Sequence, residues 1–311
     1  LVREDRVNSF RRGNHISEID VLNPDGRKYV YGIPVYNLIQ KEVSFSVEKY
    51  SGRVSTGLTA YTDKNNSPFN SSGKDGYYSR EEVPAYAHSF LLTGILSPDY
   101  VDITGNGISD DDIGDAVKFN YSKTSGISNP FSWRAPYITD SANYNEGMRS
   151  YDRDDKAHYI YGTKELWYLN SIESKSMIAT FTLQPRADLL EANERGHKIN
   201  NGKAMCLKQI DLYSKADFMD KGVRATPIKT VHFEYSYELC RGINAPLPLN
   251  DSGKLTLKRI WFTYNGNNKG ALNPYVFNYH PNNPRYKVSS SDKWGTYKDA
   301  SQNPGYTTGN P

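Results

Sequence analysis

The sequence has only two cysteines, Cys206 and Cys240, among 311 residues. Two cysteines are too few for a disulfide-stabilised scaffold, and they do not form the CxxC pair that is typical of zinc and redox sites. One bridge between neighbouring strands and two free thiols are both compatible with the sequence. Cysteine usage therefore does not identify the cellular compartment.

The sequence also lacks any apolar run near the roughly 18–20 residues that a membrane-spanning helix needs. Its most apolar short segment, residues 90–96, is much shorter and is predicted to belong to a core. The charge is close to balanced, with 38 Lys and Arg against 35 Asp and Glu, and no Lys/Arg-rich run is present. Because nucleic-acid binding needs a basic patch or stripe, we expect neither a membrane span nor a nucleic-acid partner.

An initiator methionine and a signal peptide are absent as well. The first residue is Leu1, and the charged residues Arg3, Glu4, Asp5 and Arg6 follow it directly. We therefore interpret the sequence as a mature product or as a fragment of a longer chain.

Hydrophobic residues are scarce, at 37% of the chain, and the mean hydropathy is -0.71. Such values raise the question of disorder, but disordered chains are poor in aromatic residues. This sequence contains 25 Tyr, 11 Phe and 4 Trp. Because Tyr has a large apolar body and a polar tip, it fills a core and still tolerates water. We predict an ordered, Tyr-rich protein.

Alternation of polar and apolar residues predicts strands along the whole chain. Segments 15–21 and 27–31 flank the turn sequence Asn-Pro-Asp-Gly at 23–26, which predicts a hairpin because Pro fixes φ and Gly supplies positive φ. The other alternating segments are 42–47, 117–121, 177–183, 206–213, 229–237, 254–264 and 275–279. Half-polar strands are typical of antiparallel sheets with one face in water. The predicted fold class is all-β, mostly antiparallel, with one or two short helices and long loops.

Helices and domain boundaries have weaker signals. Segments 83–96 and 186–195 are predicted as short helices, and the Ser-, Asn-, Gly- and Asp-rich segments 62–79 and 122–156 as long loops. The predicted organisation is an N-terminal β-rich part at 1–125, a loop-rich connection at 126–160, a C-terminal antiparallel part at 161–298 and a linker-like tail at 299–311. A single continuous β-rich module is equally compatible with the sequence.

The acidic segment 102–112 has the most specific pattern in the chain. EF-hand-like calcium loops take ligands from positions 1, 3, 5 and 9 and from the carbonyl at 7, with Gly at 6. Counting from Asp102 places Gly107 at position 6, and the predicted ligands are Asp102, Thr104, Asn106, the carbonyl of Ile108, Asp110 and Asp112. Position 12 is Ile113 instead of a bidentate Glu, so Asp111 or Asp112 has to substitute for it.

This loop therefore predicts a calcium site of modest affinity, suited to millimolar extracellular calcium. The alternative is an Asx-rich turn that hydrogen-bonds to its own backbone. A calcium site of this type favours an exported location, at the cell surface or outside the cell.

Aromatic residues gather in the loop-rich stretch 133–168. If they are exposed, they form a surface that stacks on sugars or peptides, and Trp133, Tyr137 and Trp167 are the candidate ligand-binding residues. If they are buried, they anchor long loops, and this second interpretation is the one that the sequence favours.

Catalytic motifs are missing from the sequence. It contains no Ser nucleophile elbow, phosphate loop, HExxH helix or dinucleotide fingerprint. A glycoside hydrolase needs two carboxylates a few ångströms apart in space, and Glu165, Glu173 and Glu234 are the acidic residues in segments that look ordered. The sequence therefore leans towards a non-catalytic protein, with a glycoside hydrolase as an alternative.

Several stretches resemble a known class of proteins. Segments 27–36, 100–107 and 291–298, together with 254–264 and 274–279, resemble very large exported proteins of the Bacteroidetes type. In particular, they resemble the β-rich shell and propeller regions of RHS proteins and of SpvB-like Tc-toxin B components. Residues 102–107 are similar to the Asp-x-Thr-Gly-Asp-Gly loops of these proteins, with Asn106 in place of the usual Asp.

The resemblance implies a scaffold or encapsulating role beside a separate effector, or a surface adhesin, and it carries over no catalytic residues. Clear YD-type repeats and tandem propeller loops are absent, so the resemblance implies a piece that flanks a shell. From residues and resemblance together we expect a non-catalytic scaffold module of a large exported protein, stabilised by Ca2+. A carbohydrate- or protein-binding adhesin module is the first alternative. The expected partners are other domains of a parent chain and a glycan or protein ligand.

Overall fold

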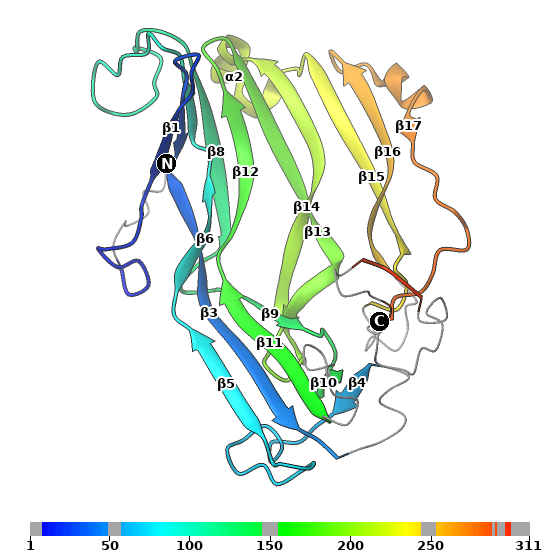
Figure 1. The fold of residues 1–311 in the computed structure, drawn as a ribbon. Coiled ribbons are helices and arrows are strands. Elements are labelled where there is room, and N and C mark those ends of the chain that lie inside the picture. Colours follow the sequence, from blue (N-terminus) through cyan, green and yellow to red (C-terminus); the bar gives the residue numbers. More distant parts are fainter. Residues whose placement is uncertain are drawn as a thin grey trace.

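The computed structural model describes residues 8–48, 57–144, 155–243, 253–287, 290 and 296–299. Strands account for 53% of the structure and helices for 6%. The strands form a ten-stranded and a seven-stranded sheet, and all described pairings between strands are antiparallel (Figure 1). The predicted all-β class is therefore confirmed. Within the described part of the chain, no helix is long and apolar enough to cross a bilayer.

The larger sheet spans most of the molecule and contains the longest strands. In spatial order it consists of β1 (Ile19–Leu22), β2 (Lys28–Tyr31), β7 (Gly94–Leu96), β8 (Ala116–Ser125), β12 (Leu166–Glu173), β13 (Met177–Ala192), β14 (Lys198–Ser214), β15 (Lys229–Leu239), β16 (Lys254–Tyr264) and β17 (Tyr275–Val276). The predicted hairpin is confirmed as β1 and β2, with Gly26 at φ 81° in its turn.

The cluster of buried hydrophobic residues lies on the smaller sheet. This sheet has the order β4 (Leu58–Ala60), β10 (Ser141–Tyr144), β11 (Lys156–Lys164), β3 (Ile33–Ser46) and β5 (Tyr78–Val83), while β6 (Tyr86–Leu91) pairs with β3 and β9 (Phe131–Ala135) pairs with β11. The rings of Tyr61 and Tyr159 stack there with centroids 5.8 Å apart, next to Phe45. The Tyr159 hydroxyl donates to Glu194 Oε1 at 3.0 Å, so buried Tyr residues fill this core and remain hydrogen-bonded.

Both helix predictions are wrong. Residues 83–96 contain all of β6 and β7, and residues 186–195 lie mainly in the last part of β13. Neighbouring strands provide hydrogen-bond partners and packing that local sequence does not reveal, and this tertiary context decides the conformation. The α-helix in the described part of the chain, α2 (Lys215–Lys221), follows β14 directly and has no buried residue, so it offers no apolar stripe to detect. Two short 3-10 turns are η1 (Gly222–Arg224) and η2 (Asn268–Leu272).

The loop predictions are correct in part. Residues 62–77 are irregular as expected, but the predicted loop 122–156 contains the end of β8 and all of β9 and β10, so it is wrong there. The larger sheet combines strands from before residue 125 with strands from after residue 160, and the smaller sheet includes β9 and β10 from within the interval 126–160. The predicted domain boundaries stay a prediction. The predicted tail lies outside the described residues apart from Asp299. Cys206 is buried, Cys240 is exposed, and both are free thiols.

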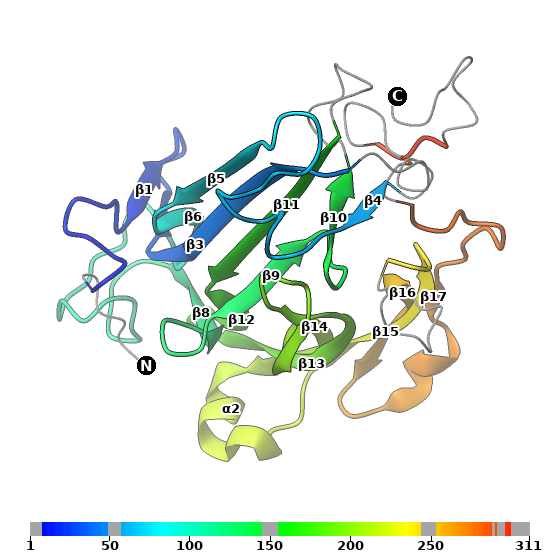
Figure 2. The same cartoon turned by 90° about the horizontal axis from the view of Figure 1, so that it is seen from below.

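The two sheets are joined at a corner where the chain passes directly from one to the other. Three connections lie there: Gly32 between β2 and β3, residues 92–93 between β6 and β7, and Glu165 between β11 and β12. Figures 1 and 2 show the smaller sheet continuing into the larger one through these strands. The corner therefore brings together residues that are far apart in the sequence.

At this corner β2 continues into β3, and β6 continues into β7. The order of these two continuous segments differs between the two sheets. In the larger sheet β7 lies between β2 and β8, whereas in the smaller sheet β3 lies between β6 and β11. The backbones approach closely, because the Thr93 N–H donates to the Val30 carbonyl at 2.7 Å and a Cβ on Gly32 would lie 2.7 Å from Thr93 Oγ1. As a result, the pairing of β8 with β7 ends at Lys118.

Candidate functional site

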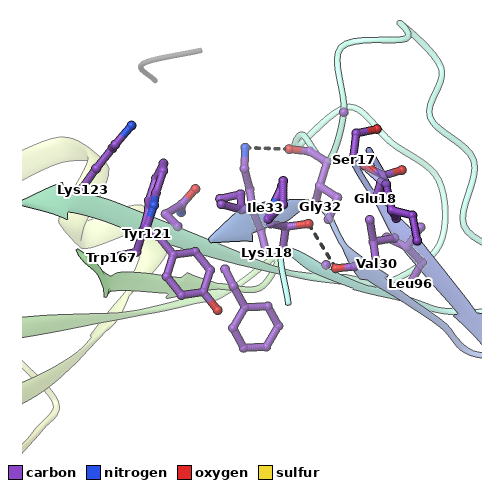
Figure 3. A pocket seen from close by; sticks show the side chains of 18 of the residues that line it. Ser17, Glu18, Val30, Gly32, Ile33, Leu96, Lys118, Tyr121, Lys123 and Trp167 are labelled. Carbon is purple, nitrogen blue, oxygen red and sulfur yellow. Dashed lines mark hydrogen bonds between the residues drawn. The ribbon is translucent and has the colours of Figure 1, made fainter. Parts of the chain in front are cut away.

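A groove with a volume of about 1190 Å³ opens at the corner between the sheets. Its walls come from the N-terminal segment, the β2–β3 connection, the loop that follows β7, and one edge of β8 (Figure 3). The lining includes the charged residues Arg11, Glu18, Asp102, Lys118 and Lys123, the aromatic residues Tyr121 and Trp167, and Pro34. A concave site of this size with aromatic and charged groups is the usual form of a binding site.

A buried carboxylate fixes the corner beside the groove. The Glu165 side chain is only 1% exposed and accepts from Arg11 Nη2 at 2.9 Å, while Lys123 Nζ lies 3.2 Å away. It also accepts from the Tyr36 N–H at 3.2 Å and from Trp167 Nε1 at 3.3 Å. A buried charge is tolerated when it is paired and hydrogen-bonded in this way. Glu165 therefore ties the N-terminal segment, β3, β8 and β12 together.

The predicted ligand-binding aromatics are not brought together. Trp167 lines the groove, with Lys123 Nζ 5.2 Å from its ring centroid (Figure 3). Trp133 lies on β9 opposite Gly162, and Lys164 Nζ is 5.8 Å from its ring centroid. Tyr137 follows the end of β9, and burial raises the pKa of its hydroxyl. Neither Trp133 nor Tyr137 lines the groove.

The acidic loop forms part of the groove wall and is closed by its own hydrogen bonds. The Asp102 carboxylate accepts from the N–H groups of Gly105 at 2.7 Å and Gly107 at 2.9 Å. These two glycines have φ of 69° and 86°, which only glycine adopts readily. This part of the loop therefore has the geometry of an Asx-rich turn.

Asp112, another predicted ligand, points into the loop. Its carboxylate accepts from the Tyr100 hydroxyl at 2.7 Å, the Ser109 N–H at 2.8 Å and the Ile103 N–H at 3.3 Å. The hydrogen bond from Tyr100 is the main cause that lowers the pKa of Asp112, and burial together with this carboxylate raises the pKa of Tyr100. Both Asp112 oxygens are thus occupied within the fold.

Lysine ammonium groups contact two of the other predicted ligands. Lys118 Nζ donates to the Ile108 carbonyl at 3.0 Å, and Lys215 Nζ forms an ion pair with Asp110. Within the described residues, no three His, Cys, Asp or Glu side chains converge on one point that suits a metal ion. A calcium ion at this loop would have to displace both ammonium groups from the Ile108 carbonyl and from Asp110. The calcium site stays a prediction, and no step of the function is derived through it.

Calcium titration tests this predicted site directly. If the loop binds calcium only when folded, the midpoint of thermal unfolding rises with calcium concentration. The free energy of unfolding then increases by about 2.7 kcal/mol at a hundredfold excess of calcium over Kd. Asp102→Asn would then abolish the rise, whereas Asp25→Asn, in the β1–β2 turn, would leave it unchanged. A midpoint that is constant up to millimolar calcium contradicts the prediction and leaves the lysine-held loop.

The acidic residues considered for glycoside hydrolysis are also not brought together. Glu165 precedes β12 and Glu173 ends it, so they lie roughly 26 Å apart at about 3.3 Å per residue. Glu234 is on β15, where Arg259 Nε lies 3.5 Å from its carboxylate. Glycosidase carboxylates are about 5–10 Å apart, so Glu165 and Glu173 do not make such a pair.

The groove itself was not found from the sequence. Alternation in β8 does predict where Lys118 and Tyr121 lie along a strand, but no local signal shows that β7 leaves this strand or that Arg11 packs beside it.

Comparison with known proteins does not identify a family: no family model matches the chain, and neither curated proteins nor solved structures gave a match. The resemblance to RHS and Tc-toxin shells therefore stays a prediction.

Proposed function

We propose that this chain is a non-catalytic structural module of a large exported or cell-surface protein, in which neighbouring parts continue its larger sheet. The observation that carries this proposal is the exposure of apolar side chains on the two edge strands of the larger sheet. β1 and β17 end the ten-stranded sheet on opposite sides of the molecule (Figure 1). Both strands expose apolar side chains.

The first edge strand exposes three apolar side chains beside the charged Asp20. All four residues of β1 are exposed, and they include Ile19, Val21 and Leu22, the last with 74% of its surface accessible. Edge strands of independent proteins are normally protected by charge, Pro or a covering segment, because an exposed apolar edge invites pairing with another chain. β1 therefore has the properties of a strand that packs against a further part of the protein.

The opposite edge has the same character. Tyr275 and Val276 of β17 are exposed, Tyr275 by 65%, and Phe277 and Tyr279 continue the aromatic strip. The chain here remains alongside β16, since the Phe277 N–H donates to the Lys258 carbonyl at 2.9 Å. Contiguous exposed apolar residues at an edge mark a contact surface, and this strip supports a neighbour on the second side.

The larger sheet does not enclose the compact hydrophobic core of the structure. Its long central strands β13–β16 have mostly half-buried side chains, whereas the compact core belongs to the smaller sheet. Among the described strands none pairs with the outer side of β1 or β17, and a sheet of this kind agrees with the shell-like role that the sequence resemblance implies.

Hydrogen exchange tests the proposal. The amides of β1 and β17 are expected to exchange at least about tenfold more slowly in the product of the complete gene than in this chain alone, because neighbouring segments then cover them. The amides of β11, which already lies between β3 and β9, serve as the internal control and are expected to keep their rates. Unchanged exchange at both edges, or a gene that encodes no further domain, would overturn the proposal.

The groove favours a second candidate function, a ligand-binding surface module. Trp167 and three cationic side chains line it, and Glu165 beside it pairs with two of these cations, Arg11 and Lys123.

A further inference from the structure

We infer that one end of the larger sheet, where β1, β7, β12, β14 and β16 finish, is a docking surface for a second copy of this chain. The two copies meet end to end about a twofold axis perpendicular to the sheet. This strand-end surface is distinct from the outer edges that carry the structural role proposed above, so the inference does not depend on that role.

The topology brings several connections to this end. The strands of the larger sheet pair antiparallel with their neighbours, so every second strand in its spatial order runs in the same direction. Each strand that runs towards this end is followed along the chain by its neighbour in the sheet. Figure 1 shows the connections along the upper end of the sheet. In the described part of the chain they are residues 23–27, 97–115, 174–176, 215–228 and 265–274.

Large aliphatic side chains on or next to these connections are exposed. Val223 in η1 has 96% of its surface accessible. Six others are more than half exposed, and they are Leu22, Val101, Ile103, Ile113, Met219 and Leu272. Single exposed aliphatic residues are common, but a gathering of them at one end of a protein marks a contact surface.

The segments that carry these side chains are held in place by the fold. Val101 and Ile113 form a bridge in which each N–H donates to the other carbonyl, at 3.1 and 3.2 Å. Residues that oppose each other in this way present their side chains on the same side. In α2 the ring of Phe218 packs against that of Tyr213 with centroids 5.0 Å apart, whereas Met219 is exposed. An ordered surface loses little conformational entropy when a partner covers it.

The charges divide the strand-end surface into an acidic and a basic half. Residues 97–115 contain six Asp and no Lys, Arg or Glu. The lysines that contact this loop are Lys118, Lys175 and Lys215. Together these groups leave three net negative charges. On the other side of β12 and β13, residues 216–229 contain three cationic and two acidic residues, and residues 265–274 add Lys269. That half therefore carries two net positive charges.

This division of charge determines how two copies meet. In a twofold dimer both copies use the same surface, so each half has to find its complement in the partner. An axis perpendicular to the sheet places the acidic half of each copy opposite the basic half of the other. An axis along the row of connections instead places like halves opposite each other, where like charges repel. The surface is thus self-complementary in the first arrangement.

A lipid bilayer matches the same surface less well. Apolar side chains beside Lys and Arg, as in residues 219–224, are typical of segments that lie on a membrane. The six Asp of residues 97–115 lie at the same end of the sheet, however, and anionic headgroups repel them. A second copy satisfies both halves at once.

Sedimentation equilibrium of the chain tests the inference, with EDTA present so that calcium does not alter the charge of the acidic loop. We expect the mass to rise from monomer to dimer between about 1 and 100 µM. The dimer is expected to weaken as salt screens the charges. A chain that stays monomeric throughout this range overturns the inference. If that monomer binds vesicles of phosphatidylserine and phosphatidylcholine, the surface belongs to a membrane instead.

A pair of apolar substitutions locates the contact. Val223→Ser removes a fully accessible aliphatic side chain of the strand-end surface. The Kd of the dimer is expected to rise roughly tenfold, because twofold symmetry counts the loss twice. Phe69→Ser is the control, since Phe69 is similarly exposed but lies in the irregular segment 62–77 outside this surface. An unchanged Kd for Val223→Ser, or an equal rise for Phe69→Ser, assigns the dimer to another surface and overturns the inference.

The division of charge is tested by mixing two variants. Asp111→Lys with Asp115→Lys makes both halves basic, and Arg224→Glu with Lys269→Glu makes both halves acidic. All four side chains are exposed, so both variants are expected to fold. Each variant alone is expected to be monomeric at a concentration where the wild-type chain is dimeric, and an equimolar mixture is expected to form a dimer. A mixture that stays monomeric, or variants that dimerise alone as well as the wild-type chain does, contradicts the proposed arrangement.

Discussion

Glu165→Gln is expected to destabilise the chain by about 3–5 kcal/mol, the range seen when one partner of a buried ion pair is removed. Glutamine has nearly the same shape as Glu165 but carries no charge, so Arg11 and Lys123 lose the carboxylate that they share. The side chain of Arg11 is as deeply buried as that of Glu165, and solvent does not compensate for the loss. The effect appears as a lower midpoint in equilibrium urea unfolding.

Glu82→Gln is the matched control for this prediction. Glu82 forms an ion pair with Arg80 at 2.6 Å on the surface, where both side chains are close to half exposed. Exposed pairs contribute little, so the control is expected to change stability by less than about 1 kcal/mol. Equal effects of the two substitutions would show that the corner between the sheets does not depend on the buried charge.

The ion pair at the corner also shows where sequence reasoning ends. Glu165 was recognised only as a carboxylate in an ordered segment, and its partner Arg11 is 154 positions away in the chain. No local pattern links the two, because their meeting depends on three strands passing from one sheet to the other. The groove beside them depends on the same passage, since it opens where β8 loses β7.

The strands were more accessible to prediction than the helices. Alternation places the hairpin of β1 and β2 correctly, because its turn needs Pro and Gly at fixed positions and these residues are distinctive. Segment 83–96 was misassigned because a short apolar run has no period that separates helix from strand. β6 and β7 are strands because β2, β3 and β8 pair with them.

The acidic loop illustrates a different limit of prediction from the sequence. Its spacing from Asp102 identifies a tight turn, and the structure has one, but spacing does not reveal which cations approach it. Lys118 comes from the next strand, β8, and Lys215 is the first residue of α2, 105 positions from Asp110. The sequence therefore predicts that charge at this loop needs compensation. Whether ammonium groups or calcium supply it depends on distant residues, and titration with calcium distinguishes the two.

Phe45→Ala is the second substitution with a large expected effect, a loss of about 3–5 kcal/mol in the free energy of unfolding. Phe45 is fully buried in the smaller sheet, and its ring lies 5.0 Å from that of Tyr61 and 6.4 Å from that of Tyr159. The cavity left by its ring would border hydrogen-bonded Tyr side chains, which are held in place and collapse little into the space. Phe69→Ala is the control, because Phe69 is 85% exposed and its loss is expected to stay within about 0.5 kcal/mol. Urea unfolding of both variants measures the difference. A small effect of Phe45→Ala would mean that this sheet is not the main source of stability, and that the larger sheet supplies more of it than its half-buried strands indicate.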